Sequence, residues 1–377
     1  MNLDFSEDQK LLKQMARDYL KEHAPIAAAR AVLESDAAYD AKLWQGIAEL
    51  GWLGTALPET FGGAGFGALE LAVLAEEIGR ALAPIPFSTS VYLASEAIRL
   101  AGSEEQKARF LPRLASGEWI GTFAVAEGPG IQSFEALRTS LKNGRLSGRK
   151  WPVPDGECAT FAIAAARSDR GPTLVLVDLS VPHVKREPVP TLDPSRSLSA
   201  LAFEACPAEV LGPEGNGADL WERLADRAAV LLAFEQLGGA ERAFELTREF
   251  TLGRYAFGRP IASFQAVKHR MADLWVKLEL ARSNCYYGAW ALSTDADELP
   301  VAACAAHLSA GDAFETATTE MLQLYGGVGF TWEYDCHLFL RRAKFCSLLL
   351  GGPLPWREKL VERAATQNRF VAAVDEP

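Results

Sequence analysis

The sequence of 377 residues changes its pattern twice along its length. Up to about residue 117, apolar residues recur at spacings of three and four; from about 118 to 214, short apolar runs alternate with Gly, Pro, Asn and Asp; beyond 215 the helical spacing returns. A doubly wound α/β fold requires strands that alternate with helices throughout, so this order excludes it. It predicts an α+β fold with an N-terminal helical domain (1–117), a central β-barrel or β-sandwich domain (118–214) and a C-terminal helical bundle (215–377).

Local signals predict where several elements begin. Ser6 and Ser103 each precede a Gln at the third following position, which is the pattern of a capping box at a helix start. A further helix is predicted to begin near Thr89. The glycine-rich segment 62–67 lacks G-x-G-x-x-G spacing and follows no strand, so it predicts a turn between helices rather than a phosphate-binding loop. In the C-terminal third, the spacing predicts helices over 218–253, 262–293, 298–325, 332–348 and 354–370.

The composition disfavours several classes of function. The net charge of −11 and the absence of a basic cluster argue against nucleic-acid binding. The acidic N-terminus and the lack of any run of eighteen uncharged apolar residues predict a cytoplasmic protein without a membrane segment. His269 and His307 lie on predicted helices without a second ligand at the fourth following position, so no metal site is predicted. Six cysteines without a C-x-x-C pair indicate reduced, mostly buried thiols.

Four segments carry the remaining information: LGWLGTALPETFGGAGFG (50–67), EEQKARFLPRLASGEWIGTFAVAE (104–127), RYAFGRPIASFQAVKHRMADL (254–274) and QLYGGVGFTWEYDCHLFLRRAK (323–344). Together they resemble the acyl-CoA dehydrogenase family, in the right order and over essentially the whole chain. The resemblance implies FAD as cofactor and the α,β-dehydrogenation of an acyl-CoA thioester, in which a carboxylate takes the α-proton and the flavin takes the β-hydride. It also implies an electron-transferring flavoprotein as acceptor.

The resemblance assigns cofactor-binding roles to two of these segments. Arg254 stands where the family places an Arg against the FAD diphosphate, Phe257 packs beside the cofactor, and Gln265 lies near its adenosine. A diphosphate favours a permanently charged partner with several donors, which Arg provides. The alternative is that Arg254 only solvates a helix end and that Phe257 belongs to the core.

The later segment is the one that the family brings to the FAD of a neighbouring subunit. Gln323, Gly326 and Gly327 match it, and glycine lets a backbone approach a ligand closely. The same glycines would also serve as an ordinary helix end. If the family arrangement holds, the chain forms a homo- or hetero-oligomer, a dimer or tetramer.

The sequence departs from the family in the β-domain. Ala126 stands where the family usually has a Thr near the flavin ring. The aromatic residue that often lies against the flavin is found one position early, as Trp151, so that stacking on the flavin and a plain packing role both remain open for it.

The sequence also lacks a carboxylate at the positions where the family usually has its catalytic base. The two positions that family members use hold Leu350 and Ala228, neither of which accepts a proton. Glu235 lies seven residues beyond Ala228 on nearly the same helix face, in an apolar stretch that would raise the pKa of a carboxyl group toward that of a general base. A partly exposed or ion-paired helix Glu is the alternative. Two other functions stay open: a non-catalytic or half-site subunit of a hetero-oligomeric acyl-CoA dehydrogenase, and a flavin oxidase or monooxygenase on the same scaffold.

Overall fold

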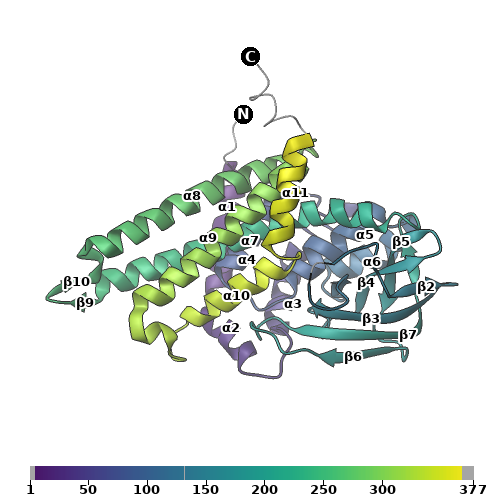
Figure 1. Ribbon diagram of the computed structural model, residues 1–377, viewed down its shortest axis with the longest axis horizontal. Coiled ribbons are helices and arrows are strands. Elements are labelled where there is room, and N and C mark those ends of the chain that lie inside the picture. Colours follow the sequence, from purple (N-terminus) through teal and green to yellow (C-terminus); the bar gives the residue numbers. More distant parts are fainter. Residues whose placement is uncertain (1–4, 131, 367–377) are drawn as a thin grey trace, which may run out of the picture. The chain divides into compact units, whose positions relative to one another are not determined.

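Helices open and close the chain, with a β-sheet between them (Figure 1). The computed structural model describes residues 5–130 and 132–366. The residues group into two compact units. One contains the chain up to Ala29, Ala68–Ala83 and the residues from Ala229 onward; the other contains Arg30–Gly67 and Pro84–Ala228.

The N-terminal region is helical, as predicted. Both capping boxes form: the Oγ of Ser6 accepts from the N–H of Gln9 at 3.2 Å, and that of Ser103 accepts from the N–H of Gln106 at 3.1 Å. The segment predicted to start a helix near Thr89 is a π-helix that continues into α5. The elements are α1 (Glu7–His23), α2 (Ile26–Leu33), α3 (Ala41–Glu49), 3₁₀ turns at Trp52–Gly54 and Glu59–Phe61, α4 (Ala68–Arg80), the π-helix Ser88–Ser95, α5 (Glu96–Ala101) and α6 (Glu104–Ala115).

The central region forms one mixed sheet of eight strands. The hydrogen-bonded order is β6-β7-β3-β2-β4-β5-β8, and β1 pairs in parallel with β4. The alanine-rich strand β4 is almost entirely buried, because its small side chains pack on both faces of the sheet. The strands are β1 (Gly121–Ala124), β2 (Ser140–Lys142), β3 (Arg145–Pro154), β4 (Phe161–Ser168), β5 (Gly171–Asp178), β6 (Val184–Pro188), β7 (Leu198–Pro207) and β8 (Glu209–Leu211).

Long helices follow, with one interruption that the apolar spacing did not predict. A two-stranded hairpin separates the first two of them, so the predicted helix 262–293 begins at Gln265 after a 3₁₀ turn; the helix predicted from residue 332 begins at Cys336. The elements are α7 (Gly217–Gly253), β9 (Tyr255–Ala256), β10 (Arg259–Pro260), a 3₁₀ turn at Ile261–Ser263, α8 (Gln265–Ser293), α9 (Leu299–Tyr325), a 3₁₀ turn at Gly326–Phe330, α10 (Cys336–Leu348) and α11 (Pro353–Thr366). The last predicted residues of α11, 367–370, lie outside the described residues.

Two glycines let α4 and α7 pack backbone to backbone. A Cβ added to Gly79 would lie 1.8 Å from the carbonyl oxygen of Glu235, and one added to Gly238 would lie 1.8 Å from the carbonyl oxygen of Glu76. A side chain at either position would therefore force the two helices apart.

All six cysteines are free and all except Cys158 are buried, which confirms the predicted thiols. None of the described helices is long and apolar enough to span a bilayer.

Candidate functional site

The first predicted cofactor segment lies where α7 ends and α8 begins. The N–H of Arg254 donates to the carbonyl oxygen of Phe250 at 2.8 Å, and the carbonyl oxygen of Arg254 accepts from Ile261 at 2.8 Å, so both main-chain groups are satisfied locally. The hairpin then places Phe257 in the left-handed region (φ 53°) with 97% of its surface exposed. Gln265 is exposed at the start of α8.

The side chain of Arg254 is free to bind a ligand. It is exposed and forms no ion pair with any residue of 5–130 or 132–366. Its guanidinium therefore keeps its full set of donors, which suits an anion with several acceptor oxygens.

The second predicted segment lies at the end of α9. Gln323 is exposed, and Gly326 has a φ of 64° where the helix stops. No heavy atom would lie within 4 Å of a Cβ added to Gly326 or Gly327, so the backbone here borders open space. A ligand can approach such a backbone closely.

Packing between α7 and α9 brings the two segments to the same end of the helical bundle. The rings of Phe250 and Tyr325 stack with centroids 3.9 Å apart, and the Tyr325 hydroxyl donates to the carbonyl oxygen of Leu246 at 3.2 Å. Burial raises the pKa of Tyr325 to about 12, so the hydroxyl keeps its proton. Arg254 and Gly326, which are 72 positions apart in the sequence, thus follow directly from helices that pack together.

The residues present fit an FAD. The Arg254 guanidinium, which has no ion-pair partner among the described residues, suits a diphosphate. The exposed ring of Phe257 offers a flat apolar surface, and the backbone at Gly326 and Gly327 is accessible to a ligand.

Trp151 lies in the other unit, on β3. It is half-buried, and its N–H donates to the carbonyl oxygen of Ala126 at 2.8 Å. The preceding Lys150 is fully buried, and its Nζ donates to the carbonyl oxygen of Val125 at 3.1 Å and to Oε1 of Glu127 at 2.8 Å. The departures noted in the sequence, Ala126 and Trp151, are therefore hydrogen-bonded to each other.

Glu127 is the centre of this polar cluster, which was not predicted from the sequence. Its carboxylate also accepts from the backbone N–H groups of Arg138 at 2.8 Å and Thr139 at 2.9 Å. Burial would raise its pKa, but the hydrogen bonds from Lys150 and Thr139 and from these backbone groups outweigh that effect and lower it to about 2. Burial lowers the pKa of Lys150 to about 8, against the opposing effect of Glu127. A lysine inside the predicted β-domain, directly before Trp151, was the signal that could have revealed the cluster, since a buried lysine needs a carboxylate.

Glu235 is buried in the middle of α7, with 2% of its surface exposed. Its neighbour Phe234 stacks on Tyr286 of α8 with centroids 6.0 Å apart, and its own carbonyl group lies against Gly79. Glu235 lines neither a cavity of about 530 Å³ beside α1, α4, α7 and α10 nor one of about 60 Å³ beside α9. Leu350 is buried with 7% exposed, and its apolar side chain offers no proton acceptor. The role of Glu235 as a base stays a prediction.

Comparison with known proteins identifies the family. Residues 6–118 match the family model "Acyl-CoA dehydrogenase, N-terminal domain", and residues 215–353 match "Acyl-CoA dehydrogenase, C-terminal domain". The acyl-CoA dehydrogenase IpdE2 of Mycobacterium tuberculosis is 35% identical over 350 residues, which cover 92% of this chain and 94% of that protein.

Two solved structures share the fold. A steroid acyl-CoA dehydrogenase variant, Tcur3481-Tcur3483, superposes with a TM-score of 0.88 at 32% identity, covering 96% of this chain and 99% of the other. A chain of the ChsE4-ChsE5 complex from Mycobacterium tuberculosis superposes with a TM-score of 0.87 at 25% identity, covering 97% and 99%.

This chain belongs to the acyl-CoA dehydrogenase family. It is an FAD-dependent oxidoreductase that acts on the CH–CH bond of acyl-CoA thioesters, and the predicted three-part α+β fold is confirmed.

Proposed function

We propose that this chain dehydrogenates an acyl-CoA thioester between its α- and β-carbons, with Glu235 as the α-proton acceptor and Arg254 as the anchor of the FAD diphosphate. The observation that carries the proposal is the convergence of the Arg254 and Gly326 segments at one end of the bundle, with an uncommitted guanidinium and open glycine backbone. When bound, FAD supplies the acceptor for the β-hydride. Phe257, Gln265, Gln323 and Gly327 complete the proposed cofactor contacts, and Trp151 is proposed to lie against the flavin.

Glu235 is proposed as the base by elimination. The two usual positions hold Leu350 and Ala228, and both side chains are buried and apolar. In the proposed step the α C–H bond breaks, its proton passes to the Glu235 carboxylate, and its electron pair joins the forming double bond.

Replacement of Glu235 by Gln tests this role. Glu235→Gln keeps the shape of the side chain but cannot accept the proton, so flavin reduction by the thioester should slow by roughly 10²–10⁴-fold, while FAD content is retained. Glu249→Gln, which changes an exposed carboxylate of the same helix, is the control and should reduce at the wild-type rate. Reduction of the Glu235→Gln flavin at the wild-type rate would place the base elsewhere. No reduction of the wild type by any thioester would favour the non-catalytic subunit instead.

Replacement of Arg254 tests the cofactor anchor. Arg254→Lys keeps a charge but loses the planar fork, so FAD should bind more weakly by about 1–3 kcal/mol. Arg248→Lys changes an exposed Arg on α7, six residues before Arg254, and this variant should bind FAD as the wild type does. Equal FAD affinity in Arg254→Lys, Arg254→Ala and wild type would contradict the assignment.

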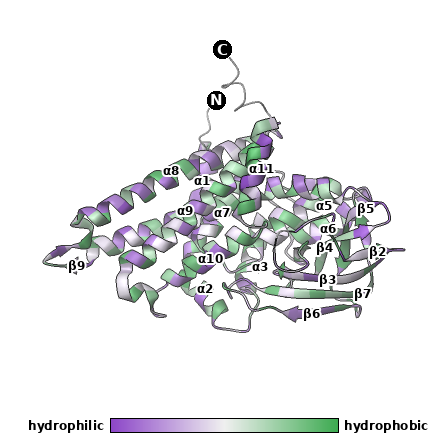
Figure 2. Cartoon of the chain, viewed as in Figure 1, coloured by the Kyte–Doolittle hydropathy of each residue, from purple (hydrophilic) through white to green (hydrophobic). Residues whose placement is uncertain are grey.

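We further propose that the chain works as a homo- or hetero-oligomer. Large apolar side chains are exposed on α8, where hydrophobic and hydrophilic residues mix along the helix (Figure 2). Trp275 is 50% exposed, Val276 56% and Leu280 62%. Such a surface supports burial against another subunit. Sedimentation should give a dimer or tetramer, and an FAD-loaded monomer at micromolar concentration would refute the proposal.

The remaining assignments are also proposals. An electron-transferring flavoprotein serves as acceptor, and the six free thiols support a reducing, cytoplasmic location. The functional domains are 1–117, 118–214 and 215–377.

A further inference from the structure

One cavity among the described residues has no part in the proposed cofactor site. It has a volume of about 530 Å³, within the range of roughly 300–1,000 Å³ typical of small-molecule sites. Helices α1, α4, α7 and α10 and the start of α2 enclose it, all within one unit. None of the residues proposed to hold FAD lines it. A ligand here would therefore occupy a second, separate site.

Part of the cavity lining is an apolar wall. Leu20 of α1, Ile26 of α2, Leu246 of α7 and Phe339 of α10 contribute side chains to this wall. Leu20 has only 2% of its surface exposed and Phe339 only 1%, so the wall continues the core of the bundle. An apolar group placed against it would be removed from water.

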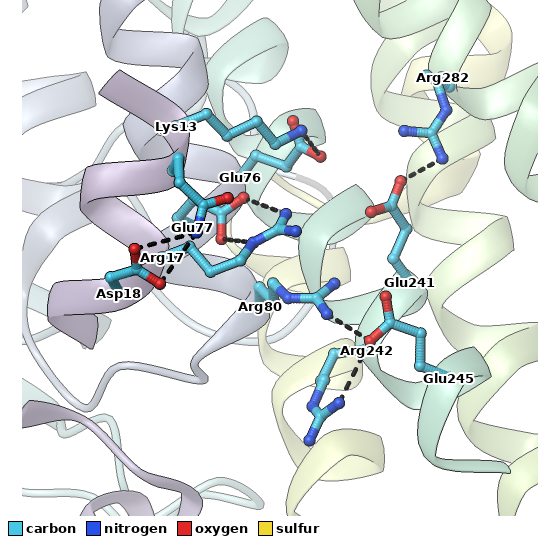
Figure 3. Close-up of polar contacts among 11 residues, drawn as sticks. Lys13, Arg17, Asp18, Glu76, Glu77, Arg80, Glu241, Arg242, Glu245 and Arg282 are labelled. Carbon is cyan, nitrogen blue, oxygen red and sulfur yellow. Dashed lines mark hydrogen bonds and ion pairs between the residues drawn. The ribbon is translucent and has the colours of Figure 1, made fainter. Parts of the chain in front are cut away.

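The charged part of the lining carries more cations than anions. Arg17, Lys21, Arg80 and Arg242 line the cavity together with the carboxylates of Glu77 and Asp335. Arg17 already has a partner, because its Nε and Nη2 donate hydrogen bonds to the carboxylate of Glu77 at 2.9 and 2.7 Å (Figure 3). This pair is the fixed part of the charged wall.

The other cations that line the cavity, Lys21, Arg80 and Arg242, outnumber the carboxylates beside them, Glu245 and Asp335. Figure 3 shows Arg80 from α4 and Arg242 from α7 converging on a single carboxylate, Glu245. The Nη1 of Arg80 is buried and has no hydrogen-bond partner among the described residues, and Lys21 forms no ion pair with any of them. A buried donor without a partner costs free energy that an added acceptor would recover. The cavity thus combines an apolar wall with unused cationic donors.

We propose that this cavity binds an amphipathic carboxylate, a carboxylate group carried on an apolar body. The carboxylate pairs with the exposed ammonium of Lys21, and the Arg80 side chain turns its partnerless Nη1, which is closed to solvent in the unliganded chain, toward it. The apolar body lies along Leu20, Leu246 and Phe339. The Nη2 of Arg80 already donates to a carboxylate beside the cavity, that of Glu245, and its Nη1 has no partner among the described residues, so the guanidinium can accommodate a second carboxylate. A neutral ligand leaves the donors unpaired, and a cation is repelled.

The test uses the FAD-loaded protein and octanoate as probe. Calorimetric titration should show octanoate binding, with octanol, octylamine and inorganic phosphate each binding at least tenfold more weakly. Arg80→Gln should weaken octanoate binding at least tenfold, the lower end expected for a lost hydrogen bond to a charged group. Lys21→Gln, at an exposed position where folding is not at risk, should weaken it severalfold. Lys10→Gln, on the same helix but outside the cavity, is the matched control and should bind as wild type.

A competition experiment separates this site from the thioester site. Octanoate should bind equally well when acyl-CoA saturates the protein, and it should leave the flavin absorption spectrum unchanged. Displacement of octanoate by acyl-CoA, octanol binding as tight as octanoate, or wild-type affinity in both Arg80→Gln and Lys21→Gln would each overturn the proposal. The readout is the heat of octanoate binding, so a failure of the Glu235 assignment would leave this result intact.

Discussion

The packing of α4 on α7 provides a direct test of the structure. It depends on two glycines, Gly79 and Gly238, each of which has only a hydrogen atom where other residues have a side chain. At Gly79, an added Cβ would lie 1.8 Å from the carbonyl oxygen and 2.7 Å from the Cα of Glu235. At Gly238 it would lie 1.8 Å from the carbonyl oxygen of Glu76. Ordinary contact begins at 3.4 Å, so alanine at either position requires the helices to separate by about 1.6 Å (3.4 − 1.8).

The cost follows from that displacement. The clashing atoms belong to helix backbone and cannot rotate away, unlike the end of a flexible side chain. A gap of 0.5–1 Å already loses about a quarter to a half of a dispersion contact, and overpacking typically costs about 1–3 kcal/mol. Gly79→Ala gains up to about 1 kcal/mol from helix propensity. We expect a net loss of about 2–3 kcal/mol in the free energy of unfolding, at the upper end of the overpacking range because the clash is with backbone.

Gly253→Ala is the matched control. Gly253 ends α7, and no heavy atom lies within 4 Å of the position that an added methyl group would take, so only the propensity gain remains. Urea unfolding followed by circular dichroism should show a lower midpoint for Gly79→Ala and Gly238→Ala, and an unchanged or higher midpoint for Gly253→Ala. The double variant should lose less than the sum, since one separation relieves both clashes. A midpoint for Gly79→Ala at or above that of wild type would refute this reasoning.

Three further perturbations address buried charges. Arg196→Met leaves Asp155 as a buried carboxylate without its ion-pair partner, and it should lower the free energy of unfolding in urea by about 3–5 kcal/mol. Arg149→Met removes an exposed ion pair, with Glu187, and should lower it by less than about 1 kcal/mol. Equal losses in the two variants would contradict the burial argument. Burial lowers the pKa of His307 to about 4, so between pH 6.5 and 4 the unfolded state binds more protons than the folded state. The free energy of unfolding therefore falls as the pH decreases through that window. His307→Leu should flatten this part of the profile of stability against pH. The pKa of Glu127 is lowered to about 2, so its contribution to the free energy of unfolding is complete above pH 4.5 and is lost as the pH falls toward 2. The stability of Glu127→Gln should therefore depend less on pH over that interval. An unchanged acid profile would count against the cluster.

Helix starts and the order of domains were predictable because they depend on neighbours in the chain. The capping boxes at Ser6 and Ser103 each join residues three apart, and the structure confirms both. The hairpin at 255–260 was not predictable in this way, because its strands have only two residues each and leave no periodicity to detect. The π-helix at Ser88–Ser95 has the apolar content of an α-helix, so spacing could not distinguish the two.

The candidate site was predicted only as separate segments. Arg254 and Gly326 carry motifs that name a family, but their placement at one end of the bundle depends on the stacking of Phe250 on Tyr325. The Glu127–Lys150 pair, 23 residues apart, and the Arg80–Glu245 pair, 165 apart, leave no local pattern. Residues three or four apart meet because the helix itself brings them together, whereas residues this distant meet only when elements pack, and packing is decided by the shape of the whole core.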